Sequence, residues 1–160
     1  MTRKEFLAGS AAFVSAPVFS IIGDAPLGVA LVGCGNRGKG ALKNLLDAAK
    51  IVECKIDIKA FCDFFPEKAF QAVQEFNLMG KAKLFIGPIA YQQVMAMKDV
   101  DVVLLCTPIC FRPLHLMEAV KAGKHVFAEK AFAVDAPGAR MCIEAGKIAA
   151  SKGLAIVAGT

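Results

Sequence analysis

The segment that most directly suggests chemistry is a glycine-rich turn. Its residues are Gly33, Cys34, Gly35, Asn36, Arg37 and Gly38, and they directly follow the apolar run Leu27 to Val32. In a G-x-G-x-x-G turn between strand and helix, the first glycine allows the tight turn and the second lets the backbone approach a pyrophosphate. The third lets helix and strand pack closely. The helix N-terminus then offers N–H groups and a partial positive charge to the anion. The turn therefore predicts a site for a dinucleotide pyrophosphate.

A phosphate-binding P-loop is the competing interpretation of the same residues. The run from Gly33 to Lys39 also fits the start of the G-x-x-x-x-G-K pattern. That pattern needs Ser or Thr next, because the hydroxyl holds a magnesium ion. This chain has Gly40 there, so the sequence argues against a P-loop.

Asp63 is the candidate partner for the adenosine ribose. It ends the second strand-like run, 25 positions after Gly38. A carboxylate at this place accepts hydrogen bonds from ribose hydroxyls and repels a 2′-phosphate. Asp63 therefore favours NAD over NADP, although nearby Lys68 keeps NADP open. The alternative is an ordinary acidic residue in a strand-to-helix loop.

Two further strand ends carry candidate residues. Thr107 and Pro108 close the fourth apolar run, and Glu129 and Lys130 close the fifth. Open parallel sheets bind ligands at the carboxyl ends of their strands. A lysine there can donate or accept a proton, because burial and neighbouring charges readily move its pKa. Plain turn chemistry for the first pair and a solvated loop for the second remain alternatives.

The elements that must position these residues alternate along the chain. Continuous apolar runs predict strands buried on both faces, and apolar residues at helical spacing predict helices between them. Expected strands cover residues 27–32, 56–62, 83–86, 100–106, 125–128 and 154–158. Expected helices cover 37–50, 89–97 and 112–122, with others starting at Pro66 (apolar face Phe70, Val73 and Phe76) and near Asp135. The order predicts an α/β fold: a doubly wound parallel Rossmann sheet of six strands with helices on both faces.

Composition excludes several classes of protein. A chain of 160 residues with 56% hydrophobic and 21% charged residues suits one globular domain. The net charge of +5 is spread without a dense basic tract, so nucleic-acid binding is not expected. No C-x-x-C pair occurs, so we expect no metal site and core packing for all six cysteines. We interpret both histidines, His115 and His125, as structural.

The first 25 residues have the pattern of an export signal. A basic start is followed by an uncharged stretch rich in small residues from Phe6 to Gly23. Thr-Arg-Lys-x-Phe-Leu is similar to the twin-arginine signal, with Lys4 in place of the second arginine. The stretch is short and weakly hydrophobic for a stable membrane span. We therefore expect residues 1–25 to direct export to the periplasm and residues 26–160 to form the nucleotide-binding domain. A retained anchor, or an ordinary N-terminal helix of a cytoplasmic protein, is the alternative.

Several segments together carry a family resemblance. In order and spacing, Leu27 to Gly38, Asp101 to Pro108, the A-G-K-H-V run from Ala122, and Glu129-Lys130 resemble the N-terminal domain of the glucose–fructose oxidoreductase and inositol dehydrogenase (Gfo/Idh/MocA) family. The resemblance implies NAD(P)-dependent hydride transfer on sugars, cyclitols or related small molecules. It further implies that the Glu-Lys pair lies beside the nicotinamide and that Lys130 binds the reacting hydroxyl and assists proton transfer.

The chain departs from the family pattern at three points. Ala131 replaces the usual proline after Glu-Lys, and Arg112 stands where a histidine is common. In the family a second domain supplies most of the substrate site; we expect this chain to lack that domain and therefore to lack full activity on its own. A stand-alone nucleotide-binding module or inactive fragment, and the NAD-binding half of a glycosidase of the same family, are the alternative functions. Homo-oligomer formation stays open.

Overall fold

Six parallel strands form the centre of the molecule in the order β3-β2-β1-β4-β5-β6. The computed structural model describes residues 25–159, so the predicted export segment lies outside the described residues apart from its last position. The strands are β1 (Leu27–Val32), β2 (Ile56–Asp63), β3 (Lys83–Ile86), β4 (Val102–Leu105), β5 (His125–Ala128) and β6 (Ile156–Ala158). The order reverses between β1 and β4, which places a topological switch point beside the glycine turn. The predicted Rossmann architecture is confirmed.

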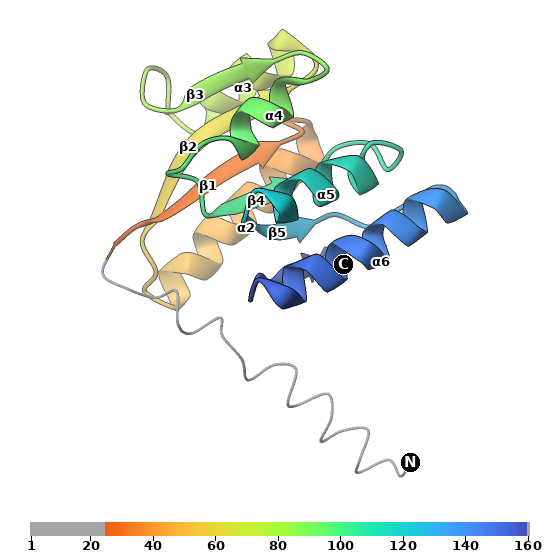
Figure 1. The fold of residues 1–160 in the computed structure, drawn as a ribbon. Coiled ribbons are helices and arrows are strands. Elements are labelled where there is room, and N and C mark those ends of the chain that lie inside the picture. Colours follow the sequence, from red (N-terminus) through yellow and green to blue (C-terminus); the bar gives the residue numbers. More distant parts are fainter. Residues whose placement is uncertain (1–24, 160) are drawn as a thin grey trace.

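Helices cover both faces of the sheet (Figure 1). The helices are α2 (Asn36–Ile51), α3 (Pro66–Glu75), α4 (Ala90–Met95), α5 (Arg112–Lys121) and α6 (Ala136–Ser151). One apolar core joins the sheet to α2 and α3, and a second joins it to α4, α5 and α6. Strand β1 contributes to both cores: Val29 and Leu31 face the first, whereas Ala30 and Val32 face the second. Successive strand side chains point to opposite faces, so the continuous apolar run of β1 follows from its central position.

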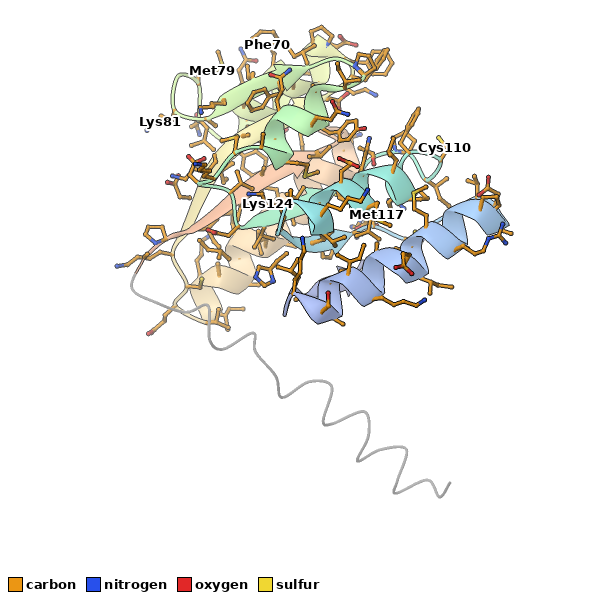
Figure 2. The ribbon with its side chains drawn as sticks, viewed as in Figure 1. Phe70, Met79, Lys81, Cys110, Met117 and Lys124 are labelled. Carbon is orange, nitrogen blue, oxygen red and sulfur yellow. The ribbon has the colours of Figure 1, made fainter. Side chains whose placement is uncertain are left out.

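The apolar face predicted for α3 is partly wrong. Val73 is fully buried as expected, but its buried neighbours on the helix are Ala69 and Ala72. Phe70 is 43% exposed and lies on the outer side of the fold (Figure 2). Each helical residue turns about 100° from the one before it, so a face through 69, 72 and 73 leaves residue 70 outside.

The cysteines do not all pack in the core. Cys34 and Cys62 are buried, three others are partly buried (Cys54, Cys106 and Cys142), and every cysteine is a free thiol. Cys110 is exposed in the turn before α5 (Figure 2), so the core prediction is wrong for this residue. The next residue, Phe111, is also exposed, so residue type alone does not decide burial in this turn.

Lys124, from the A-G-K-H-V run, is a buried structural lysine rather than a solvated one (Figure 2). Its Nζ donates hydrogen bonds to the carbonyls of Met97 (2.5 Å) and Val100 (2.8 Å). Burial lowers the pKa of this ammonium, and the nearby Asp101 and Asp99 oppose that shift. The lysine thereby fixes the loop that leads into β4, at the end of the sheet opposite the glycine turn. Within residues 25–159, no helix combines the length and apolar character needed to cross a membrane.

Candidate functional site

The three glycines of the turn meet three different geometric needs. Gly33 has a φ of +97°, a conformation that side chains disfavour. A Cβ on Gly38 would lie 1.9 Å from the carbonyl oxygen of Gly33, so α2 can approach β1 this closely only without a side chain. A Cβ on Gly35 would meet no heavy atom within 4 Å. The open side of the turn therefore lies at Gly35, where a ligand can reach the backbone.

The N-terminus of α2 is left available for an anion. Its N-cap is Gly35, no side chain caps the helix, and its first turn holds no acidic residue. The first N–H groups of a helix have no partner within the helix. These groups and the helix dipole therefore favour a phosphate at this position.

Asp63 is tied directly to the glycine turn. Its Oδ2 accepts a hydrogen bond from the backbone N–H of Cys34 at 2.6 Å, and its Oδ1 accepts one from Phe65 N–H at 2.9 Å. A carboxylate oxygen has two lone pairs, so both oxygens can still accept hydrogen bonds from ribose hydroxyls. The structure thus brings Asp63 to the turn in an orientation fixed by backbone contacts.

Glu129 and Arg37 connect the end of β5 with the start of α2. Glu129 is 3% exposed, and its Oε1 lies 2.5 Å from Nη2 of Arg37. Despite this ion pair, no donor among the described residues points at Oε1 in hydrogen-bond geometry. The ion pair with the Glu129 carboxylate raises the pKa of Arg37. The charge of Arg37 compensates this buried carboxylate, and a carboxylate oxygen has a second lone pair that a ligand donor can use.

Thr107, Pro108 and Lys130 reach the same edge of the sheet in different ways. Thr107 is buried, and its Oγ1 lies 3.2 Å from Nδ1 of His115, so its hydroxyl points into the protein. Pro108 and Lys130 are exposed, and the peptide bond between Lys130 and Ala131 is cis. The proposed contacts of these residues with a cofactor or substrate stay predictions.

Two residues that the sequence did not mark as functional also shape this edge. The Arg112 guanidinium is buried and donates to the carbonyl oxygens of both Thr107 and Ala131. Gly159, at the end of β6, passes so close to Glu129 that a Cβ would lie 2.6 Å from Oε1. In the sequence, Arg112 stands out only as a departure from the family pattern, and no local pattern marks Gly159.

His115 is held neutral inside the fold. It packs on Tyr91 with 4.2 Å between ring centroids. Burial, and secondarily the charge of Arg112, lowers the pKa of His115 to about 4. The imidazole is therefore neutral at neutral pH, which agrees with the interpretation of His115 as structural.

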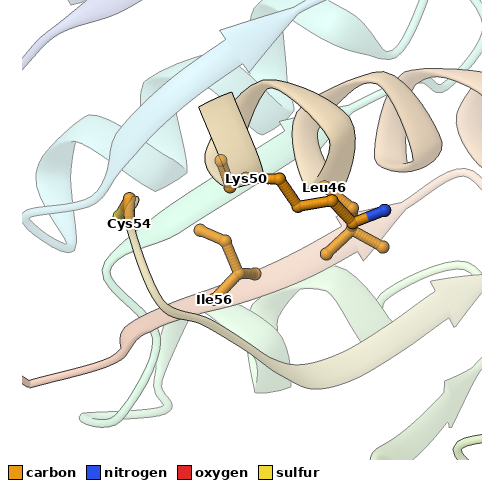
Figure 3. A pocket seen from close by; sticks show the side chains of 5 residues that line it. Leu46, Lys50, Cys54 and Ile56 are labelled. Atoms are coloured by element: carbon orange, nitrogen blue, oxygen red, sulfur yellow. The ribbon is translucent and has the colours of Figure 1, made fainter. Parts of the chain in front are cut away.

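A surface hollow of the described domain does not coincide with this chemistry. It has a volume of about 230 Å³ and is lined by Leu46, Ala49, Lys50, Cys54 and Ile56 (Figure 3). These residues lie at the end of α2 and the start of β2, whereas the glycine turn lies at the other end of both elements. Across residues 25–159, no three potential metal-binding side chains gather into a ligand set.

Two features fit a dinucleotide pyrophosphate, the uncapped helix N-terminus and the turn open at Gly35, and the ion-paired carboxylate of Glu129 lies at the same edge of the sheet. The chain belongs to the Gfo/Idh/MocA family, because the model of this oxidoreductase family, an NAD-binding Rossmann fold, matches residues 27–160. It is therefore the NAD-binding domain of an oxidoreductase family.

Curated relatives and solved structures are similar to this domain. A glycosyl hydrolase family 109 protein of Shewanella pealeana is 29% identical over 106 residues, which span 63% of this chain and 22% of the relative. The structure of GenD2 from gentamicin A biosynthesis, in complex with NAD, has a TM-score of 0.68 at 21% identity and covers 84% of this chain and 34% of its own. A putative myo-inositol dehydrogenase of Sinorhizobium meliloti 1021 has a TM-score of 0.67 at 23% identity. The match covers 83% of this chain and 36% of the dehydrogenase chain.

A fourth relative carries the other cofactor. The 3-ketoreductase KijD10 of Actinomadura kijaniata, solved with NADP and TDP-benzene, has a TM-score of 0.63 at 24% identity over 84% of this chain and 37% of its own. This chain thus spans about a fifth of the curated relatives and about a third of the solved ones. These likenesses to solved structures show the shared fold.

We predict opposite effects from alanine at two glycines of α2. Gly38→Ala places a methyl group against the Gly33 carbonyl and should lower the free energy of unfolding by about 1–3 kcal/mol while weakening NADH binding. Gly40→Ala meets open space and should raise the free energy of unfolding by about 0.5–1 kcal/mol. Urea unfolding and NADH titration measure both. Equal effects of the two substitutions would contradict the close approach at Gly38.

We predict a pH dependence of stability from His115. The pKa of His115 is about 4 in the folded chain, below its usual 6.5. Its contribution to the free energy of unfolding is therefore complete above pH 6.5 and is lost as pH falls through 4. The loss should reach about 3 kcal/mol at most. Urea unfolding measures the free energy of unfolding between pH 6.5 and pH 4. This free energy should fall less steeply with decreasing pH in His115→Asn than in the wild type. Identical slopes would show that His115 titrates normally in the folded chain.

Proposed function

We propose that this domain binds NAD in preference to NADP and serves hydride transfer on a CH–OH group of a sugar, cyclitol or related small molecule. The observation that carries the proposal is the joined site of glycine turn and Asp63, in which the Cys34 N–H donates to the Asp63 carboxylate. This bond couples a phosphate cradle to a ribose-binding carboxylate. Both halves of an adenosine diphosphate unit thus have a partner within one fixed arrangement.

Charge near Asp63 supports NAD over NADP. The carboxylate would lie where a 2′-phosphate must sit, and like charges disfavour that contact. The cation that the sequence leaves as a candidate partner for a 2′-phosphate, Lys68, has its Nζ 4.5 Å from the centroid of the Phe65 ring. This cation–π contact competes with a 2′-phosphate for the ammonium, so it reduces the counter-charge that Lys68 offers.

The nicotinamide, when bound, would accept or supply the hydride. The described residues contribute binding and proton handling around it. The N-terminus of α2 would hold the pyrophosphate, and Asp63 would orient the ribose. The exposed Lys130 would hydrogen-bond the reacting hydroxyl and take or return its proton. The Glu129 carboxylate, held by its ion pair with Arg37, would accept a hydrogen bond from the cofactor.

Glycoside cleavage is the second candidate, because curated relatives at 29–31% identity are glycosyl hydrolase family 109 proteins. A stand-alone nucleotide-binding module is the third. Isothermal titration with NADH tests the cofactor site, and no binding at millimolar ligand would contradict all three. Turnover of a panel of sugars and inositols would support hydride transfer, and release of alcohol from chromogenic glycosides would support glycoside cleavage. NADH binding without either activity would support a stand-alone module.

We also propose that residues 1–25 form a cleaved export signal. The first backbone hydrogen bond of the sheet is Leu27 N–H to Lys55 O at 2.8 Å, so removal of the segment would leave β1 whole. Protein purified from its host should begin near residue 26. A mature chain that begins at Met1 would contradict cleavage.

We predict that Asp63→Asn shifts cofactor preference. The amide oxygen can still accept from the Cys34 N–H, but the negative charge is gone. The ratio of the NADPH Kd to the NADH Kd should fall about tenfold, equivalent to about 1.4 kcal/mol of removed repulsion. Fluorescence titration with both nucleotides measures the ratio, with Asp57→Asn on the exposed part of β2 as control. An unchanged ratio in a folded variant would refute the ribose role.

A further inference from the structure

Arg112 occupies an unfavourable position for a simple surface cation. It is the first residue of α5 and is only 4% exposed. A positive charge at a helix N-terminus opposes the helix dipole, and burial removes its hydration. Burial accordingly lowers the pKa of the guanidinium from its usual value. A buried arginine at this position needs a compensating contact.

The compensation comes from two carbonyl groups on different loops. Nη2 donates to the carbonyl oxygen of Thr107, in the loop after β4, and Nη1 donates to that of Ala131, in the loop after β5. The guanidinium has a rigid fork of donors that can hold two acceptors at once, which a lysine ammonium matches poorly. Arg112 therefore joins two strand-end loops that share no other side-chain hydrogen bond among residues 25–159.

The joined loops are those that carry the candidate chemistry. Ala131 directly follows Lys130, and Glu129 is paired with Arg37 of α2. We propose that Arg112 is a positioning residue, which fixes the Glu129–Ala131 loop against the loop after β4 and so aims Lys130 and Glu129 at the cofactor edge. This inference rests on the proposed function, because only that function gives Lys130 a reacting partner.

The first test measures the loop without any cofactor. The amide of Glu129 donates to Leu105 O at 3.0 Å, so its hydrogen exchange reports how firmly the loop is held. In Arg112→Lys and Arg112→Met, NMR-detected exchange of this amide should become at least about tenfold faster relative to the core amides of Leu104 and Leu105. Arg140→Lys, an exposed arginine of α6, is the control and should change nothing.

Chemical rescue separates positioning from a general loss of packing. In Arg112→Ala, added guanidinium at tens of millimolar should slow the exchange of the Glu129 amide again, whereas equal sodium chloride should not. If the alanine and methionine variants do not fold, Arg112→Lys carries the test. Exchange that is unchanged, or that rises uniformly across the domain, would overturn the proposal.

The second test asks whether the loop serves the cofactor. Arg112→Lys should raise the Kd for NADH by at least about threefold. A loosened loop with unchanged NADH affinity would overturn the positioning role. If the wild type does not bind NADH, the proposed function fails, and the exchange data still decide whether Arg112 joins the two loops.

Discussion

The close approach of α2 to β1 is the constraint on which the rest of the site depends. A Cβ on Gly38 would lie 1.9 Å from the Gly33 carbonyl oxygen, so the helix begins directly against the strand. Because of this approach, the uncapped N-terminus of α2 points to the edge where the other strands also end. An anion at that edge meets free N–H groups and the positive end of the helix dipole.

Three side-chain contacts then connect neighbouring strand ends into one surface. Asp63 joins β2 to the turn after β1, Arg37 and Glu129 join α2 to the end of β5, and Arg112 joins the loops after β4 and β5. The contacts of Asp63 and Arg112 are charge-assisted hydrogen bonds, which are stronger than neutral ones, and Arg37 and Glu129 form an ion pair. A parallel sheet has its loops at one edge but does not by itself fix them relative to each other, and these contacts supply that order.

The sequence predicted the elements well and the contacts between them poorly. The apolar run of β1 and the glycine turn depend on local periodicity and backbone geometry, which a single sequence carries. Arg112, Gly159 and the exposed Phe70 depend on which residues from distant segments meet in space. The pairing of β5 with its neighbouring strands brings Gly159 and the partners of Arg112 together, and the small alanines of α3 decide which face of that helix is buried. A single sequence does not show either feature.

We propose that the turn from Gly33 to Gly38 holds a dinucleotide. The most direct measurement is an NMR titration of the ¹⁵N-labelled chain with NAD, observing the backbone amides of the turn and of the first residues of α2. Saturable shifts are predicted for the amides of residues 34–38, with smaller shifts near Asp63 and Glu129. Amides of the turn that stay unmoved at millimolar NAD, or shifts confined to the hollow near Cys54, would contradict the account.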